Sequence, residues 1–71
     1  MATAEPRRFI RRHQVEALTS LSRTQIYRLI ARNEFPRQVK LAPGHAVWVE
    51  QEVAAWVDQR IAAARGEAAY A

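Results

Sequence analysis

The sequence predicts a mainly α-helical domain with one small β-hairpin, arranged as a winged helix-turn-helix. Two short amphipathic helices, expected over residues 12–19 and 22–33, are separated by a short turn, which is the spacing of a helix-turn-helix. Two β-prone runs flank a Pro-Gly pair within residues 38–49 and predict a hairpin wing, and a third helix is expected over residues 50–65. Since a two-stranded hairpin is not stable alone in water, it has to pack on the helices.

The length of the chain allows one domain with a thin core, because a chain of 71 residues buries only about 60% of its extended surface. We expect the domain to span residues 9–65, with an N-terminal tail at 1–8 and a C-terminal tail at 66–71. Phe9 and Ile10 are expected to anchor the start of the domain to the core, and they can form a short strand.

The two helices of the predicted helix-turn-helix differ in how clearly the sequence defines their apolar faces and their ends. Val15 and Leu18 give the first helix an apolar side, and Ser20 begins the break after it. The N-terminus of the second helix is well defined, because Ser22 and Gln25 can form a capping box. Its apolar face and its end are defined by the following residues: Ile26, Leu29 and Ile30 at helical spacing, Asn33 as a left-handed C-cap, and Pro36 as a block to continuation.

The third helix and the hairpin supply the remaining apolar groups. The helix has two glutamates in its first turn, Gly66 as its expected end, and an apolar stripe made of Val53, Trp56, Val57 and Ile61. We expect Trp48 and Trp56 to lie in the core rather than to stack on bases.

Positive charge is concentrated in the first part of the chain. The net charge is +4 overall. Residues 1–40 carry nine arginine or lysine residues against three glutamates, a net charge of +6, whereas residues 41–71 carry two against four, a net charge of −2. This asymmetry indicates a polyanionic partner, although charge runs alone also occur on ordinary solvated surfaces.

Several classes of function are excluded by what the sequence lacks. There is no cysteine, and His13 and His45 have no further metal ligands at suitable spacing, so we expect no metal site, no cofactor and no enzymatic activity. No apolar run approaches the about 18 residues that cross a membrane, and no signal peptide is visible, so we expect a cytoplasmic, nucleoid-associated protein.

The second helix has the layout of a helix that reads DNA in the major groove. Its back is apolar, and its first turns are polar and basic. Arginine pairs well with guanine and glutamine with adenine, so the base-reading candidates are Ser22, Arg23, Thr24, Gln25 and Arg28. An ordinary amphipathic surface helix is the competing interpretation.

Other side chains are better suited to the DNA backbone. The phosphate-binding candidates are Tyr27, Arg32, Arg37 and Lys40, and the candidate wing tip is Pro43, Gly44 and His45. For Tyr27 the alternative is a ring that closes the edge of the core. For Lys40 and His45 the alternative is a hairpin that only covers the core.

Taken together, these motifs resemble the AlpA family of prophage regulators, which are relatives of excisionases and MerR-type winged helices. The resemblance covers roughly residues 9–62 and is carried by Ser-Arg-x-x-Ile-Tyr-Arg at 22–28, Phe-Pro at 35–36, Trp48 and Trp56. It implies a DNA-binding winged helix-turn-helix that acts as a transcriptional regulator or as a recombination directionality factor assisting an integrase.

The resemblance carries over to particular positions. Those that match the family's reading helix are Arg23, Thr24, Tyr27 and Arg28, and the turn at 42–45 matches its wing. The chain departs from the family at three places: Ser20 and Asn33-Glu34 stand where glycine is usual, and His45 stands where the wing commonly has arginine.

Three functions stay open on the sequence. The first is a promoter-binding regulator, the second an excisionase, and both need double-stranded DNA. The partners would be a second copy of the chain, bound cooperatively on DNA, together with an integrase or the transcription machinery. The third is a protein-interaction module without direct DNA binding, for which the third helix offers a small-residue surface: Ala54, Ala55, Ala62, Ala63 and Ala64.

Overall fold

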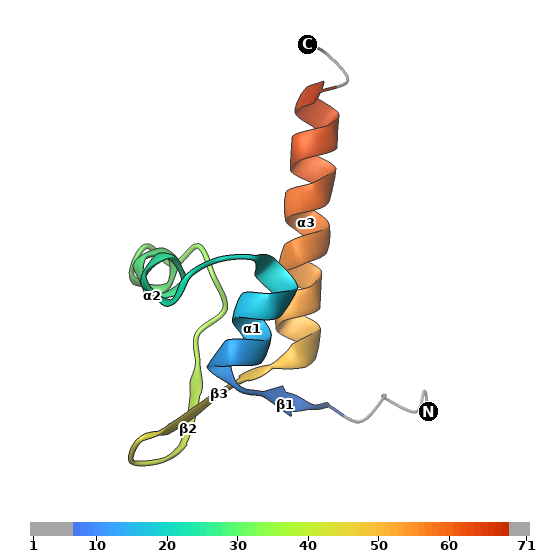
Figure 1. The fold of residues 1–71 in the computed structure, drawn as a ribbon. Helices are drawn as coiled ribbons and strands as arrows, with labels where there is room; N and C mark the ends of the chain where they lie inside the picture. The colour runs from blue at the N-terminus through green and yellow to red at the C-terminus, as the bar shows by residue number, and fades with distance from the viewer. Residues whose placement is uncertain (1–6, 69–71) are drawn as a thin grey trace.

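The computed structural model describes residues 7–68, and within them the chain forms three helices and a small antiparallel sheet (Figure 1). In chain order the elements are β1 (Phe9–Ile10), α1 (Arg12–Thr19), α2 (Arg23–Ala31), β2 (Val39–Ala42), β3 (His45–Val49) and α3 (Glu50–Ala68). The predicted fold class, mainly helical with a hairpin and compatible with a winged helix, is confirmed.

The sheet explains how the hairpin is held. Its strand order is β1-β3-β2, so β3 lies in the middle and pairs with both neighbours. Ile10 of β1 is opposite Trp48, and Val39 of β2 is opposite Val47. The turn is made possible by Gly44, whose φ of +74° lies in the left-handed region that favours glycine. The third strand supplies support that an isolated hairpin lacks.

The core draws at least one side chain from each helix and from the sheet. Its buried members are Ile10, Val15, Ile26, Phe35, Trp48 and Val53, with Leu21, Tyr27, Leu29, Ile30 and Trp56 partly buried against them. Trp48 is fully buried, and its indole N–H donates to the carbonyl oxygen of Pro36 at 3.1 Å. The prediction that both tryptophans pack with the core is therefore correct, although Trp56 stays partly exposed.

Two apolar side chains lie further out than the sequence analysis expected. Phe9 is 54% exposed, although Ile10 beside it is buried. Because successive side chains of a strand point to opposite faces, only one residue of the two-residue β1 can reach the core. Leu18 of α1 is also 49% exposed, and the anchoring of this helix depends on fully buried Val15.

The third helix is longer than predicted. It continues through Gly66 to Ala68, so the expected tail at 66–71 begins inside the helix. Glycine ends a helix where the backbone turns left-handed, and Gly66 does not adopt a positive φ. Residues 1–6 and 69–71 of the expected tails lie outside the described residues. Arg8 belongs to the expected N-terminal tail, but its carbonyl oxygen accepts a hydrogen bond from the amide of Glu50 at 2.8 Å.

The ends of α1 and α2 are defined by local chemistry. The predicted capping box is present: the Gln25 amide donates to Ser22 Oγ at 3.2 Å, and the Ser22 amide donates to Gln25 Oε1 at 2.9 Å. The helix predicted over 22–33 ends earlier, at Ala31, with Arg32 as its C-cap, and Asn33 follows with the expected left-handed φ of +59°. Ser20 adopts a φ of +61° after α1, while its amide donates to the carbonyl of Glu16 at 2.8 Å. Serine thus occupies a left-handed position for which glycine is better suited.

Replacing Ser20 by glycine is expected to stabilise the protein by about 0.5–1 kcal/mol. Glycine relieves a left-handed strain of about 1–2 kcal/mol and gives back part of that through the greater entropy of the unfolded chain. The thermal midpoint should rise by about 2–8 °C for a domain of this size. Thermal unfolding followed by circular dichroism measures the change. Ser22→Gly is the matched control: Ser22 has a φ of −79°, so this change should not stabilise the protein. A lower midpoint for Ser20→Gly would contradict the prediction.

Candidate nucleic-acid interface

Helix α2 presents one face to the core and the opposite face to solvent. Ile26 is fully buried. At about 100° per residue, the positions two before and two after Ile26 lie on the outward side. These positions are Thr24 and Arg28, and both side chains are exposed. The structure therefore brings these two predicted base-reading residues to the centre of the outward face of α2.

The other predicted base-reading residues also have structural roles. The Ser22 hydroxyl and the Gln25 side-chain oxygen both accept backbone hydrogen bonds in the capping box. The Gln25 side-chain NH₂ and the Ser22 hydroxyl hydrogen are the atoms left to donate to a ligand. The guanidinium of Arg23 lies 6.0 Å from the centre of the Tyr27 ring, so it is directed along the side of the helix.

Tyr27 sits at the edge of the core, which was one of its two predicted positions. Its ring is partly buried against the core cluster and meets Trp48 edge-on, with 6.1 Å between ring centres. Trp48 belongs to β3, so this contact joins α2 to the sheet. The position of α2 relative to the hairpin thus depends on these two aromatic rings.

Within residues 7–68, the cations of α2 and of the segments that follow it form no ion pair with an acidic side chain. Within the described residues the side-chain ion pairs are Arg8 with Glu50 at 3.7 Å and Arg12 with Glu16 at 3.0 Å, and neither involves α2 or the hairpin. Exposed cations without such a partner are Arg23, Arg28, Arg32, Arg37 and Lys40. Because their charge is not neutralised, this side of the protein can attract a polyanion.

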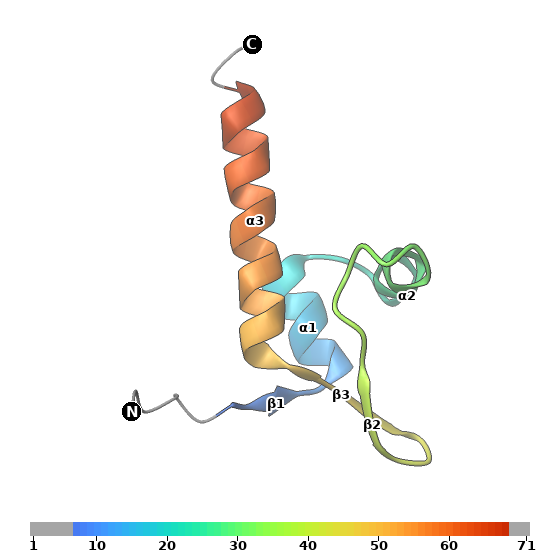
Figure 2. The same ribbon diagram turned by 180° about the vertical axis from the view of Figure 1, so that it is seen from behind.

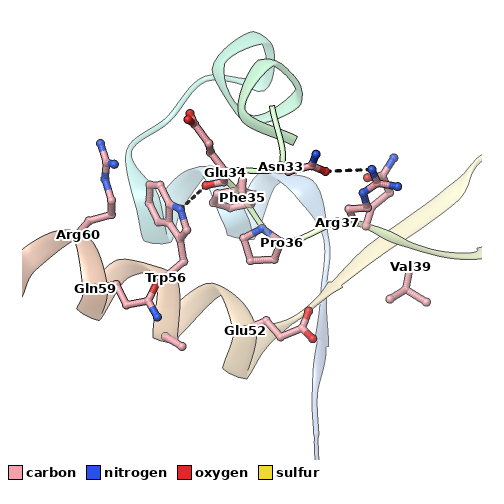
Figure 3. A pocket seen from close by; sticks show the side chains of 12 residues that line it. Asn33, Glu34, Phe35, Pro36, Arg37, Val39, Glu52, Trp56, Gln59 and Arg60 are labelled. Carbon is pink, nitrogen blue, oxygen red and sulfur yellow. Dashed lines mark hydrogen bonds between the residues drawn. The ribbon is translucent and has the colours of Figure 1, made fainter. Parts of the chain in front are cut away.

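Arg37 has a positioning partner that the sequence analysis did not single out for this role. Its Nη2 donates to the side-chain oxygen of Asn33 at 3.1 Å (Figure 3). The left-handed backbone at Asn33 and this hydrogen bond both belong to the segment that follows α2. The four-residue spacing between the two side chains could have suggested the pair only if the loop conformation had been known.

The hairpin and α2 project to the same side of the domain, away from α3 (Figures 1 and 2). At the tip, Pro43 and Gly44 are exposed, whereas His45 is half-buried at the start of β3. Leu41, which the sequence analysis did not name, is also exposed on β2, next to Lys40. The predicted wing residues therefore lie on the same side of the domain as α2.

An open groove of about 890 Å³ lies between α3 and the segment that joins α2 to β2 (Figure 3). The Trp56 indole N–H donates to the Glu34 carbonyl at 2.8 Å, and its ring meets Phe35 edge-on at 4.8 Å. The guanidinium of Arg60 lies 5.4 Å from the Trp56 ring centre. These aromatic side chains hold α3 to the loop. Among the described residues, no group of three or more histidine, aspartate or glutamate side chains is arranged to hold a metal ion.

Two short helices joined by a tight turn, followed by a hairpin, place this chain in the class of small winged-helix proteins. Residues 8–61 match the family described as "Prophage CP4-57 regulatory protein (AlpA)", and the chain belongs to this family of phage regulatory proteins. The resemblance to AlpA proteins found in the sequence is confirmed.

A relative from a phage supports the same assignment. The chain is 47% identical over 55 residues to a protein of Enterobacteria phage P4 that bears the name "Uncharacterized protein ORF88". The matched segment covers 78% of this chain and 62% of the relative's length. No solved structure matches the chain. None of the helices within residues 7–68 combines the length and apolar character that crossing a membrane requires.

Proposed function

We propose that this protein binds double-stranded DNA in a sequence-specific manner as a small transcriptional regulator. The observation that carries the proposal is the outward face of α2, where Thr24 and Arg28 are exposed opposite buried Ile26. Exposed cations that form no ion pair in the part of the chain that the structure describes lie on α2 and on the segments that follow it. Membership of a phage regulatory family supports the same function.

In the proposed complex, the first turns of α2 enter the major groove, which at about 12 Å wide admits one helix. Arg28 would read guanine through a bidentate hydrogen bond, and the side-chain NH₂ of Gln25 would reach an adjacent base. Thr24, together with Ser22 and Arg23, would complete the contacts of the first turns.

Phosphate contacts would fix the helix in the groove. Arg32 and Arg37 follow the reading face along the chain, and Lys40 extends the cationic side to the hairpin. Tyr27 would contribute its hydroxyl while its ring stays against the core. The wing, Pro43 to His45, would lie over the adjacent minor groove or backbone. These contacts carry no base information but fix the register of the complex.

A single copy would contact only a small site, because one DNA-binding module buries about 600–1,000 Å² of protein surface. Useful specificity therefore favours binding by two copies of the chain. An integrase or the transcription machinery would then be the further partner, according to where on the DNA the protein binds.

Binding to two duplexes over a range of salt concentrations tests the proposal. One duplex carries the DNA upstream of the protein's own gene, and the other has a random sequence of equal length. We expect binding that weakens steeply with salt and a clear preference for the upstream DNA. Footprinting then locates the site: protection of a promoter supports a regulator, and protection of a recombination site supports an excisionase. No binding to either duplex at low salt would overturn the proposal and favour a protein-interaction module.

Replacing Arg37 by alanine is expected to weaken binding to all sequences by a similar factor. Arg37 is exposed, and Asn33 holds its guanidinium in the segment after the reading helix, as suits a phosphate contact. Loss of one phosphate contact should reduce the slope of log affinity against log salt by about one. Titration of both duplexes measures the slope. A change in base preference with an unchanged slope would contradict the phosphate role.

A further inference from the structure

The last turns of α3 form an arm that stands clear of the rest of the domain. We define the arm as residues 58–66, and every one of them is exposed. Figures 1 and 2 both show this part of α3 extending beyond α1 and α2. Most of the stability of a helix in a protein comes from tertiary packing, so an apolar group on these exposed turns is available for contact with another surface.

The apolar stripe of α3 continues onto the arm. Val53 is fully buried, Val57 is half-buried, and Ile61 is 42% exposed. Residues four apart lie on one side of a helix, so these side chains form one row that leaves the core. Ala64 extends the row by a further turn. The contact surface that fixes the base of α3 to the domain is therefore continuous with an uncovered surface on the arm.

Two opposite charges flank Ile61 on the same side of the helix. Asp58 lies three residues before Ile61 and Arg65 four residues after it, so both are displaced from it in the same direction around the helix. They are about 10 Å apart along the axis and cannot pair with each other. Neither takes part in an ion pair within the described residues. The positions three and four residues from Asp58 hold no cation: they are Ala54, Ala55, Ile61 and Ala62.

We propose that the arm is a homodimer interface, on which a second copy of the chain packs antiparallel with the two Ile61 side chains at its centre. A two-fold axis brings the same surface of both copies together. Asp58 and Arg65 are nearly equidistant from Ile61, so Asp58 of each copy meets Arg65 of the other. In a parallel pair, the two Asp58 side chains would lie at one height and the two Arg65 side chains at another, so Asp58 of one copy would not meet Arg65 of the other. The charge pattern therefore selects a second copy in the antiparallel orientation.

The proposed dimer deepens the self-association suggested under the proposed function, because it names the surface involved. The arm has only a few turns, so the interface falls below the about 1,200 Å² buried in a standard stable complex, and the free dimer should be weak. Two adjacent sites on DNA would raise the effective concentration to the millimolar range and strengthen it. The two-fold axis would present the two reading helices to an inverted repeat.

Analytical ultracentrifugation of the full chain without DNA tests the interface. We expect a monomer–dimer equilibrium that shifts to dimer as the concentration rises towards about 1 mM, in line with a small interface. Asp58→Arg and Arg65→Asp should each weaken dimerisation at least about tenfold, because like charges then face each other twice. A 1:1 mixture of the two variants should dimerise again, since each copy then supplies one sign of charge. The double variant D58R/R65D should also recover dimerisation.

Other results would overturn the interface. These are a wild-type protein that stays monomeric, single variants that dimerise like the wild type, or a mixture that stays monomeric. Both positions are exposed, so circular dichroism should show unchanged folding in all variants. Binding to a duplex with one site separates the two proposals. Intact one-site binding by a monomeric wild type overturns only the dimer, and dimerisation without any DNA binding overturns only the proposed function.

Discussion

Replacing Trp48 by alanine is expected to lower the thermal midpoint by more than about 10 °C or to abolish cooperative unfolding. The side chain is fully buried and donates its indole N–H to Pro36. Removal of a buried tryptophan costs about 3–5 kcal/mol, whereas a chain of this length has a total stability of only about 4–10 kcal/mol. Thermal unfolding followed by circular dichroism measures the effect.

Trp56→Ala is the matched control for this prediction. Trp56 also donates a hydrogen bond and also packs edge-on against another ring, but it lines an open groove and is only partly buried. It should therefore lose less stability than Trp48→Ala. If Trp48→Ala melts at a temperature equal to or above that of Trp56→Ala, the central role of Trp48 in the core is wrong.

A second substitution separates the packing of Trp48 from its hydrogen bond. Trp48→Phe keeps an aromatic ring against Tyr27 but loses the donor to Pro36, and it should cost less than the alanine change. Because this ring joins α2 to the sheet, the phenylalanine variant also reports on whether the position of the reading helix relative to the wing matters for DNA binding.

Features that depend on a few neighbouring residues could be predicted from the sequence. The capping box of Ser22 and Gln25 needs only two residues three apart, and the end of α2 needs only Asn33 with a proline beyond it. The hairpin follows from its Pro-Gly turn between two β-prone runs. These local signals place both helices of the helix-turn-helix and the hairpin, with the end of α2 predicted two residues too late.

Features that depend on tertiary position could not be predicted in this way. A two-residue strand has no alternation to show which of Phe9 and Ile10 points inward. The prediction that Gly66 ends α3 is wrong, because a glycine ends a helix only where its backbone turns left-handed, and the sequence does not specify that angle. The projection of α3 beyond the core is likewise a tertiary feature, because it depends on how far along the helix the rest of the domain packs.

The candidate site shows the same division. The residue types on α2 identified a cationic helix with an apolar back, and the structure bears out the burial of Ile26 on that back. The sequence does not predict which polar side chains have atoms available to bind a ligand. Ser22 and Gln25 can either cap the helix or face outward, and in the structure they cap it. Thr24 and Arg28 have no such competing role in the described residues, so they are the sharper test of DNA reading.

Replacing Arg28 by alanine is expected to reduce affinity for the preferred duplex by about 1–3 kcal/mol and to relax base preference at one position. Arg28 lies at the centre of the outward face and takes part in no ion pair within the described residues. Binding to the preferred duplex and to its single-base variants measures both effects. Arg12→Ala is the control, because it removes the same charge from α1, where Glu16 pairs with it at 3.0 Å and which lies outside α2 and the hairpin.

Arg28→Lys distinguishes base reading from charge. Lysine keeps the positive charge but lacks the planar fork that makes two hydrogen bonds to guanine, so this variant should keep the salt dependence and lose the base preference. If lysine restored both affinity and preference, Arg28 would act on phosphate rather than on a base. If Arg28→Ala left affinity and preference unchanged, α2 would not be the reading helix, and the wing and the remaining cations would have to account for any DNA binding.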